Sequence, residues 1–206
     1  MERFTTLTAI ACPLGLANVD TDQLIPARFM KRSRAQGYGG YLLHDLRFYE
    51  DGTARPGFVL DDPRHANTKI LIARRNFGTG SSREAAVYAL WDYGIRCVIA
   101  PSFGDIFASN AVKNGLLPAT VSAADCEMLL GLSLDSAVSI DLERQTITAS
   151  GKSVPFSVDP VRRLQLLNGW DDIDLTVRHM GDIASYRAAR SASQPWTMPG
   201  QPDQSS

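Results

Sequence analysis

The stretch that decides the fold runs from Asn76 to Glu84 and reads NFGTGSSRE. It follows the short apolar segment 68–73, TKILIA, which is typical of a buried strand, and it precedes the helix-forming residues 83–93. The sequence therefore predicts a strand, a loop and a helix in that order, with the glycines in the loop.

This loop has the residues of an anion-binding site. Gly78 and Gly80 can adopt positive φ and so let backbone amides turn inward. Ser81 or Ser82 is a suitable N-cap for the following helix, whose free amides attract an anion. The planar guanidinium of Arg83 suits a carboxylate. A helix that is merely well capped, with Arg83 solvated, would explain the same residues, and both interpretations stay open here.

The known nucleotide-binding loops have a different pattern. A P-loop requires Lys-Ser/Thr after its last glycine, and the dinucleotide fingerprint requires a third glycine where Arg83 stands. A carboxylate ligand fits the loop better than a nucleotide.

The composition bounds the class of protein. A chain of 206 residues with 44% hydrophobic content is expected to form one globular domain. Its formal net charge of −1, from 21 basic and 22 acidic residues, gives no reason to expect nucleic acid or a membrane surface as a partner. The N-terminal residues lack a secretory pattern and no apolar run is long enough for a membrane span, so a cytoplasmic location is expected.

The cysteines are Cys12, Cys97 and Cys126. Their odd number and wide spacing indicate neither a disulfide framework nor a metal or cluster site within this chain. We therefore expect no cofactor and no metal to be held by this chain alone.

The remaining patterns predict an α/β fold. After a first strand at 4–11, the segments 68–73, 83–93 and 96–100 form a βαβ unit that extends through another helix and strand, around residues 68–121. Three alternating segments then predict a β-meander around residues 137–157. Helical patterns follow in 159–190, and residues 191–206 have the composition of a disordered tail. We expect a mixed, three-layer domain over residues 1–190.

Two further segments carry polar residues of interest. Asp20-Thr21-Asp22 has too few carboxylates for a calcium loop, and a turn that caps a helix at residues 23–25 is an alternative to a role in the site. Residues 29–40 are basic and then glycine-rich, which is typical of a mobile loop over a site rather than of a regular element, although a solvated basic loop would look the same. His44, His65 and His179 receive no role.

Three motifs together resemble a known family. NFGTGSSRE at 76–84, CVIAPSF at 97–103 and NAVKNGLLP at 110–118 resemble the swivelling domain of the aconitase superfamily, and above all the small subunits of bacterial 3-isopropylmalate dehydratases. The resemblance extends from about Phe4 to about Arg190. It implies a three-layer β/β/α fold and a hydro-lyase of leucine biosynthesis that interconverts 2- and 3-isopropylmalate through dehydration and rehydration.

The resemblance also assigns roles to individual residues. Ser81 matches the catalytic serine, and Ser82 and Arg83 match the substrate-binding pair, with Gly80 in the same loop. Asp20 and Thr21 match residues beside the cleft, and Arg34 lies in the loop that contacts the substrate side chain. In the family an arginine precedes a Thr-Gly-Phe-like stretch, whereas here Ala35-Gln36-Gly37-Tyr38 stands in that place.

The family's reaction needs a Lewis acid that this chain does not offer. In the family it is a [4Fe-4S] cluster held by three cysteines of a separate large subunit, so the resemblance implies a heterodimer, or a dimer of heterodimers, acting on a small hydroxy diacid. Two alternatives remain: a sibling hydro-lyase for another alkylated malate, of the citramalate or dimethylmalate type, and a carboxylate-binding module without catalysis.

Overall fold

The computed structural model describes residues 1–80 and 82–197, and the chain divides into two compact units, 1–169 and 170–206. The first unit holds the whole sheet and both hydrophobic clusters. The described part of the second, residues 170–197, is helical. Assignment of residues 1–190 to one swivelling domain stays a prediction.

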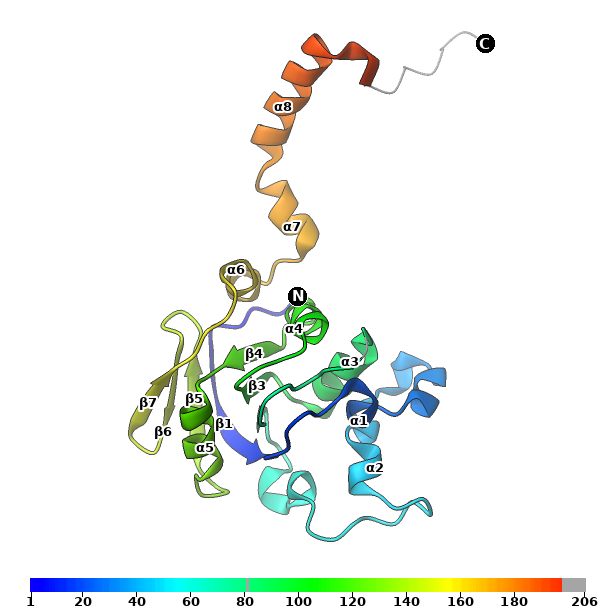
Figure 1. The fold of residues 1–206 in the computed structure, drawn as a ribbon, viewed down its shortest axis with the longest axis vertical. Helices are drawn as coiled ribbons and strands as arrows, with labels where there is room; N and C mark the ends of the chain where they lie inside the picture. Colours follow the sequence, from blue (N-terminus) through cyan, green and yellow to red (C-terminus); the bar gives the residue numbers. More distant parts are fainter. Residues whose placement is uncertain (81, 198–206) are drawn as a thin grey trace. The chain divides into compact units, whose positions relative to one another are not determined.

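A seven-stranded mixed sheet with the order β4-β3-β2-β1-β5-β6-β7 forms the centre of the first unit (Figure 1). Strand β1 joins the parallel and antiparallel parts of the sheet, because its residues 11–13 pair in parallel with β2 and its residues 6–10 pair antiparallel with β5. The predicted parallel unit and the meander are confirmed. The strands are β1 (Thr6–Pro13), β2 (Ile70–Ile72), β3 (Cys97–Ala100), β4 (Leu117–Thr120), β5 (Ala137–Asp141), β6 (Thr146–Ala149) and β7 (Lys152–Pro155).

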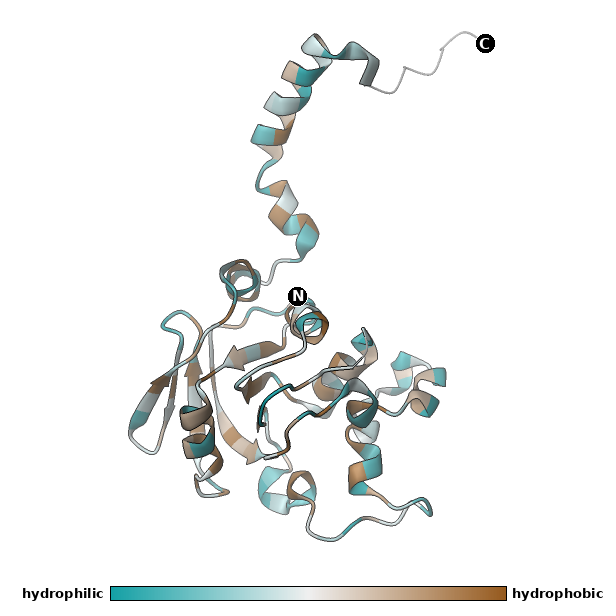
Figure 2. Cartoon of the chain, viewed as in Figure 1, coloured by the Kyte–Doolittle hydropathy of each residue, from teal (hydrophilic) through white to brown (hydrophobic). Residues whose placement is uncertain are grey.

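Alternation along the parallel strands produces two cores. Leu71 and Val98 point to one face of the sheet, where they belong to a cluster with side chains of α1, α3 and α4. Ile70 and Ile99 point to the other face, where the cluster includes side chains of the meander, α5 and α6. Figure 2 shows β3, β4 and β5 as largely apolar. The three-layer β/β/α architecture is confirmed. The helices are α1 (Thr21–Leu24), α3 (Glu84–Tyr93), α4 (Asp105–Lys113), α5 (Ala123–Leu130) and α6 (Pro160–Asn168).

Between α1 and β2 the chain forms short helical turns, and here the prediction of a loop without regular structure at 29–40 is wrong. Ser33 caps η2 by accepting a hydrogen bond from the Ala35 amide (3.3 Å), and the chain then packs on α3. The turns are η1 (Ala27–Lys31), η2 (Arg34–Gln36), η3 (Gly39–Tyr41), α2 (His44–Arg47), η4 (Val59–Asp61) and η5 (Pro63–His65).

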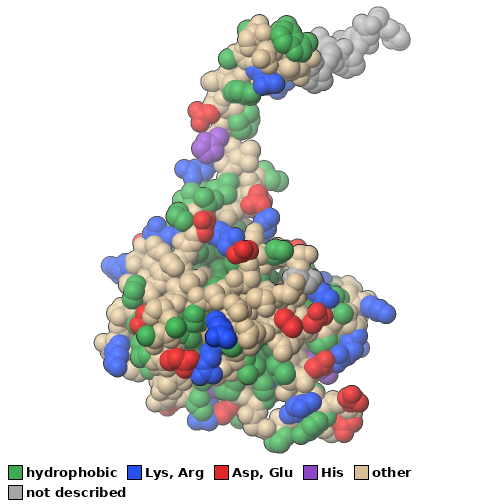
Figure 3. Space-filling view, viewed as in Figure 1, with side chains coloured by type: hydrophobic (Ala, Val, Ile, Leu, Met, Phe, Trp, Pro, Cys, Tyr) green, Lys and Arg blue, Asp and Glu red, His purple; other side chains and the backbone are tan. Residues whose placement is uncertain are grey.

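The second unit contains α7 (Asp172–Val177), α8 (Met180–Ser193) and η6 (Pro195–Thr197). Helical structure therefore runs past residue 190, where the disordered tail was predicted to begin, while residues 198–206 lie outside the described residues. No residue of α7 or α8 is buried. The visible face of the molecule carries acidic and basic side chains interspersed, in keeping with the small net charge (Figure 3).

Candidate functional site

The loop after β2 is held by the segment that follows β1. The Gly78 amide donates to the Val19 carbonyl oxygen (2.7 Å), and the Thr21 amide donates to the Thr79 carbonyl oxygen (2.9 Å). These two bonds bracket a parallel bridge between Asp20 and Thr79. Because β1 and β2 are neighbouring parallel strands, the loops at their carboxyl ends meet at one edge of the sheet, which is where open α/β sheets bind ligands.

Asp20 and Thr21 lie next to Gly80. A Cβ atom built on Gly80, whose φ is +103°, would stand 3.5 Å from the Asp20 Cβ and 3.6 Å from the Thr21 Oγ1. Thr21 is buried, with 1% of its surface exposed. The structure thus brings these three residues together, and their contact with substrate stays a prediction.

Asp20 has a structural task as well. Its Oδ1 accepts from the Gln23 amide (2.7 Å), and the Asp20 amide donates to the Gln23 side chain (3.0 Å), which together form a capping box at the start of α1. The helix-cap alternative for this segment is therefore confirmed. Asp22, two residues further along the chain, is the carboxylate that pairs with Arg83.

Arg83 stands at the N-terminus of α3 and forms an ion pair with Asp22. Some 27% of the Arg83 side chain is exposed, so its guanidinium is partly withdrawn from water yet accessible. The Asp22 carboxylate thus binds the Arg83 guanidinium, which is the kind of contact that a substrate carboxylate would make.

The start of α3 differs from the prediction in one respect. Arg83 is the N-cap residue, so the assignment of Ser82 as N-cap is wrong, while the alternative of Ser81 lies outside the described residues. Ser82 is exposed. The Arg83 side chain makes no capping hydrogen bond to the first amides of the ten-residue helix, whose N-terminal end carries the positive end of the helix dipole.

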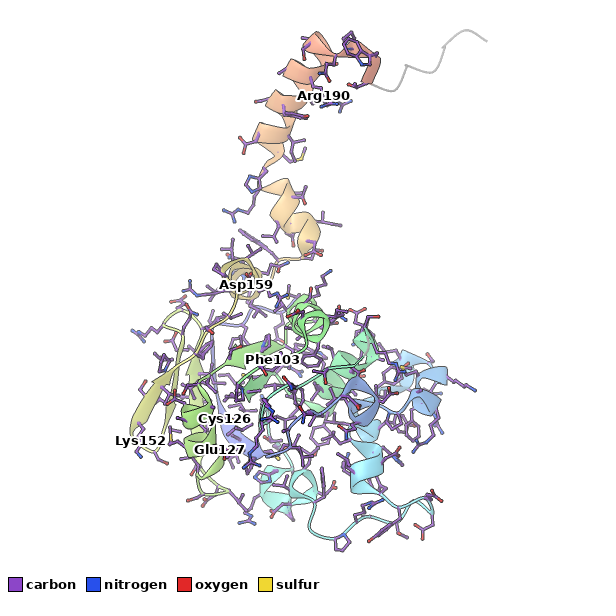
Figure 4. All side chains as sticks on the ribbon, in the orientation of Figure 1. Phe103, Cys126, Glu127, Lys152, Asp159 and Arg190 are labelled. Atoms are coloured by element: carbon purple, nitrogen blue, oxygen red, sulfur yellow. The ribbon has the colours of Figure 1, made fainter. Side chains whose placement is uncertain are left out.

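Three phenylalanines support the loop from below. Phe77 packs edge-on against Phe103 and Phe107, with ring centroids 6.3 and 5.4 Å apart, and Figure 4 shows Phe103 in the segment that follows β3. The Phe77 amide donates to the Ser102 carbonyl oxygen (3.0 Å), and the Gly104 amide donates to the Phe77 carbonyl oxygen (2.9 Å). The loop therefore lies on a rigid aromatic base rather than on solvent.

Gly78 tolerates no side chain on this base, which leads to a prediction. Its φ is +74°, and an added Cβ would stand 2.2 Å from the Phe107 ring. Left-handed strain of about 1–2 kcal/mol and overpacking of about 1–3 kcal/mol predict that Gly78→Ala destabilises the protein by roughly 2–5 kcal/mol in thermal or denaturant unfolding.

Gly151→Ala is the matched control for Gly78→Ala. Its φ of +76° is nearly the same, but no atom lies within 4 Å of the added Cβ. Only the backbone strain of about 1–2 kcal/mol is expected there. If both variants lose the same free energy of unfolding, the three phenylalanine rings move aside for the added methyl group and do not constrain the loop.

Arg34 does not join this cluster and lies instead along α3. Its Cζ is 3.4 Å from the centre of the Tyr88 ring, and its Nη2 is 3.7 Å from Asp92 Oδ1. Burial, followed by a hydrogen bond to Glu84, raises the pKa of Tyr88. Asp22, Tyr88 and Asp92 were not predicted as partners of the two arginines, although the four-residue spacing of Glu84, Tyr88 and Asp92 marks one helix face.

Ser81, to which the resemblance assigns the catalytic role, lies outside the described residues. Its neighbours Gly80 and Ser82 are described, and so are the residues that hold the loop on either side. The predicted set thus divides into a described cluster around Gly80 and Arg83, Arg34 on α3, and Ser81.

The histidines take part in other contacts. His65 is fully buried, with Nδ1 2.7 Å from the Val59 carbonyl oxygen and Nε2 3.1 Å from the Leu134 carbonyl oxygen. His44 contacts Asp45, and His179 contacts Asp182 in the second unit. Leaving them without a role in the site agrees with these positions.

The cysteines do not form a ligand set for a metal cluster. Cys12 belongs to one core cluster, while Cys97 and Cys126 belong to the other, and Figure 4 shows Cys126 on α5. Burial raises the pKa of Cys12 to about 12 and that of Cys126 to about 11, and it raises the pKa of Cys97 as well. A cluster needs three converging thiolates, and these separate, buried thiols do not fit that requirement.

Two results concern the described part of the chain as a whole. Within residues 1–80 and 82–197, no three His, Cys, Asp or Glu side chains are arranged to hold a metal ion. None of the described helices combines the length and hydropathy needed to cross a membrane.

Comparison with known proteins identifies relatives over almost the whole chain. The profile of the aconitase C-terminal domain matches residues 1–124, and the LeuD_N profile matches residues 136–160. The 3-isopropylmalate dehydratase small subunit of Rhodospirillum centenum is 50% identical over 96% of this chain and 100% of its own length. That of Paramagnetospirillum magneticum is 48% identical over 95% of this chain and 100% of its own.

A solved structure shares the fold. The crystal structure of 3-isopropylmalate dehydratase (leuD) from Methanocaldococcus jannaschii aligns with a TM-score of 0.62 and 25% identity, covering 87% of this chain and 99% of that one.

Proposed function

Since this chain belongs to the family of 3-isopropylmalate dehydratase small subunits, hydro-lyase subunits of the aconitase superfamily that serve leucine biosynthesis, we propose that its Gly80–Arg83 loop binds and deprotonates a hydroxy diacid. The observation that carries the proposal is the junction between Val19–Asp22 and Gly78–Gly80, which places Arg83 and the start of α3 at one edge of the sheet. The proposed substrate is 2- or 3-isopropylmalate.

Dehydration removes a proton from the carbon beside a carboxylate and a hydroxyl from the neighbouring carbon. We assign the proton removal to Ser81, acting as a general base in its alkoxide form, and carboxylate binding to Ser82 and Arg83. A serine alkoxide requires stabilisation by fixed dipoles and positive charge in a site from which water is excluded. The N-terminus of α3 supplies the fixed dipoles, and the Arg83 guanidinium supplies the positive charge.

Asp22 sets how Arg83 meets the substrate. In the free chain the guanidinium is paired with Asp22, so an incoming carboxylate shares or displaces that partner. Arg83 presents a planar fork that can hold Asp22 on one side and the substrate on the other, which an ammonium group cannot do.

Arg83→Lys is therefore expected to raise KM of the two-subunit enzyme by about tenfold to a hundredfold, with a smaller effect on kcat, because a bidentate charged hydrogen bond is worth roughly 1.5–3 kcal/mol. Steady-state kinetics at saturating large subunit would measure both constants. Arg144→Lys is the control, since Arg144 also pairs with an aspartate, Asp141, but lies in the meander. An unchanged KM for Arg83→Lys would remove Arg83 from carboxylate binding.

The second candidate function is that of a sibling hydro-lyase for another alkylated malate. It is favoured by one feature, the replacement of the family's Thr-Gly-Phe-like stretch by Ala35-Gln36-Gly37-Tyr38. A comparison of kcat/KM for isopropylmalate, citramalate and dimethylmalate separates the two, since one methylene in an apolar pocket is worth about 1–3 kcal/mol.

The enzyme is completed by a second chain. The relatives' designation as small subunits implies a large-subunit partner, and we propose a heterodimer or a dimer of heterodimers in the cytoplasm. The Lewis acid would be a [4Fe-4S] cluster in that partner, because the thiols of this chain do not fit a cluster. Bound in the partner, such a cluster would polarise the departing hydroxyl, while Ser82 and Arg83 of this chain would bind the carboxylate and Ser81 would take the proton.

A further inference from the structure

One face of α3 receives the loop of residues 34–39. Glu84, Tyr88 and Asp92 recur every four residues and so lie in a row on that face. The row begins one residue after Arg83, at the end of the helix where substrate carboxylate is proposed to bind. It ends at Asp92, close to the helix C-terminus at Tyr93.

Asp92 contacts two residues of the 34–39 loop, one through each of its carboxylate oxygens. Oδ2 accepts a hydrogen bond from the Tyr38 amide (2.8 Å), and Oδ1 lies 3.7 Å from Arg34 Nη2. The aspartate thus ties two residues of one loop to the same point of the helix. Its side chain is 20% exposed, which preserves the strength of both contacts better than full exposure would.

The loop has little freedom at its other contacts with the helix. A Cβ on Gly39 would stand 2.6 Å from the Tyr93 backbone nitrogen and 2.7 Å from the Asp92 carbonyl, so the backbones touch directly. Tyr38 is buried, and its hydroxyl donates to the Arg32 carbonyl oxygen (2.9 Å), which closes the loop on itself.

These contacts determine where the Arg34 guanidinium lies. It is stacked on the Tyr88 ring. Tyr88 lies five residues beyond Arg83, roughly 7.5 Å along the helix and about 140° around its axis, so the two residues lie on different faces of α3. Arg34, which belongs to η2, is therefore a second cation whose position beside α3 is set by Asp92 and Tyr88, separate from the ion pair of Arg83 and Asp22.

We propose that Asp92 is a positioning residue for substrate recognition: by binding the Tyr38 amide and the Arg34 guanidinium together, it fixes Arg34 on the Tyr88 ring. The inference rests on the proposed function, and it takes Arg34 as the substrate-contacting residue that the family resemblance implies. Asp92 itself faces the loop and acts through Arg34.

The first test measures the loop without any substrate. Asp92→Ala in the full chain should accelerate trypsin cleavage after Arg34 about tenfold, and should speed hydrogen exchange of the Tyr38 amide to a similar degree, because the charged acceptor is lost. Asp92→Asn keeps an oxygen for the Tyr38 amide but loses the charge, so it should fall between wild type and Asp92→Ala. Loop protection equal to wild type in both variants would overturn the proposal.

Asp141→Ala is the matched control. Asp141 also accepts a hydrogen bond from a backbone amide, that of Arg144 (2.8 Å), and pairs with the Arg144 guanidinium (3.1 Å), with 23% of its side chain exposed. It lies in the β5–β6 turn, so its loss should leave the 34–39 loop as protected as in wild type. Equal loosening in Asp141→Ala and Asp92→Ala would mean a general loss of stability and would overturn the proposal.

The second test uses the two-subunit enzyme. Asp92→Ala should raise KM for the hydroxy diacid about tenfold and leave kcat within about twofold, a split that a merely destabilising substitution does not produce at saturating partner. A loosened loop with unchanged KM would overturn the positioning role. A wild-type enzyme inactive on every alkylated malate would instead reject the proposed function, and the protection experiment would still report on the contact between Asp92 and the loop.

Discussion

Replacement of Ser81 by alanine is expected to lower kcat of the reconstituted two-subunit enzyme by several orders of magnitude, while KM changes only a few-fold. The reason is that the hydroxyl is used mainly in the transition state, when the proton leaves the substrate carbon, whereas carboxylate binding is assigned to Ser82 and Arg83. The described surroundings favour this role. The N-terminal amides of α3 carry the positive end of the helix dipole, and Arg83 brings a positive charge to the same helix end.

The measurement is steady-state turnover of isopropylmalate with excess large subunit, together with ligand binding by calorimetry. Ser153→Ala, at an exposed serine of β7, is the control and should retain full activity. Near-normal kcat in Ser81→Ala would end the assignment of Ser81 as the base. An inactive variant that still binds the diacid excludes the alternative of a carboxylate-binding module without catalysis, provided that the wild type turns over.

The second large effect concerns the isolated chain, which is expected to show no hydro-lyase activity and to bind no stoichiometric iron or sulfide after anaerobic reconstitution. An open-iron cluster needs three thiolates at one location. Cys12 lies in a different core cluster from Cys97 and Cys126, and burial raises the pKa of all three thiols, which disfavours the thiolate form.

Adding the large subunit should restore turnover from zero, and iron and sulfide should then copurify with the complex. A triple Cys→Ser variant of this chain is the control, and any stable, folded form of it should be as active with the partner as wild type. A brown, active preparation of this chain alone would contradict the two-subunit interpretation and would require the three cysteines to converge.

Several features of the site could be predicted from the sequence because they depend on short segments. The glycines of 76–84, the apolar run before them and the helix formers after them are local signals, and the structure confirms the strand, the loop and the helix. The capping alternative at Asp20 could likewise be derived from a few adjacent residues. The N-cap of α3 could not, because Arg83 occupies that position without any side-chain hydrogen bond to signal it.

The carboxylate partners of Arg83 and Arg34 could not be predicted from the sequence. Asp22 is 61 residues from Arg83 in sequence, and Asp92 is far from Arg34, so no local pattern selects these carboxylates over the other acidic residues. The loop at 29–40 was interpreted as mobile because its composition is basic and glycine-rich. Its helical turns and its packing on α3 come from contacts with Asp92 and Tyr93.

By itself, the sequence determined the order of strands and helices, the α/β class, the position of the glycine-bearing loop and the family, because alternation, apolar runs and motifs act over a few residues. Only the tertiary structure decided which carboxylate faces which guanidinium and which glycine lies against an aromatic ring. Those pairings depend on the parallel registration of β1 and β2 and on the packing of distant loops on α3, and charges pair with whatever partner the fold brings near.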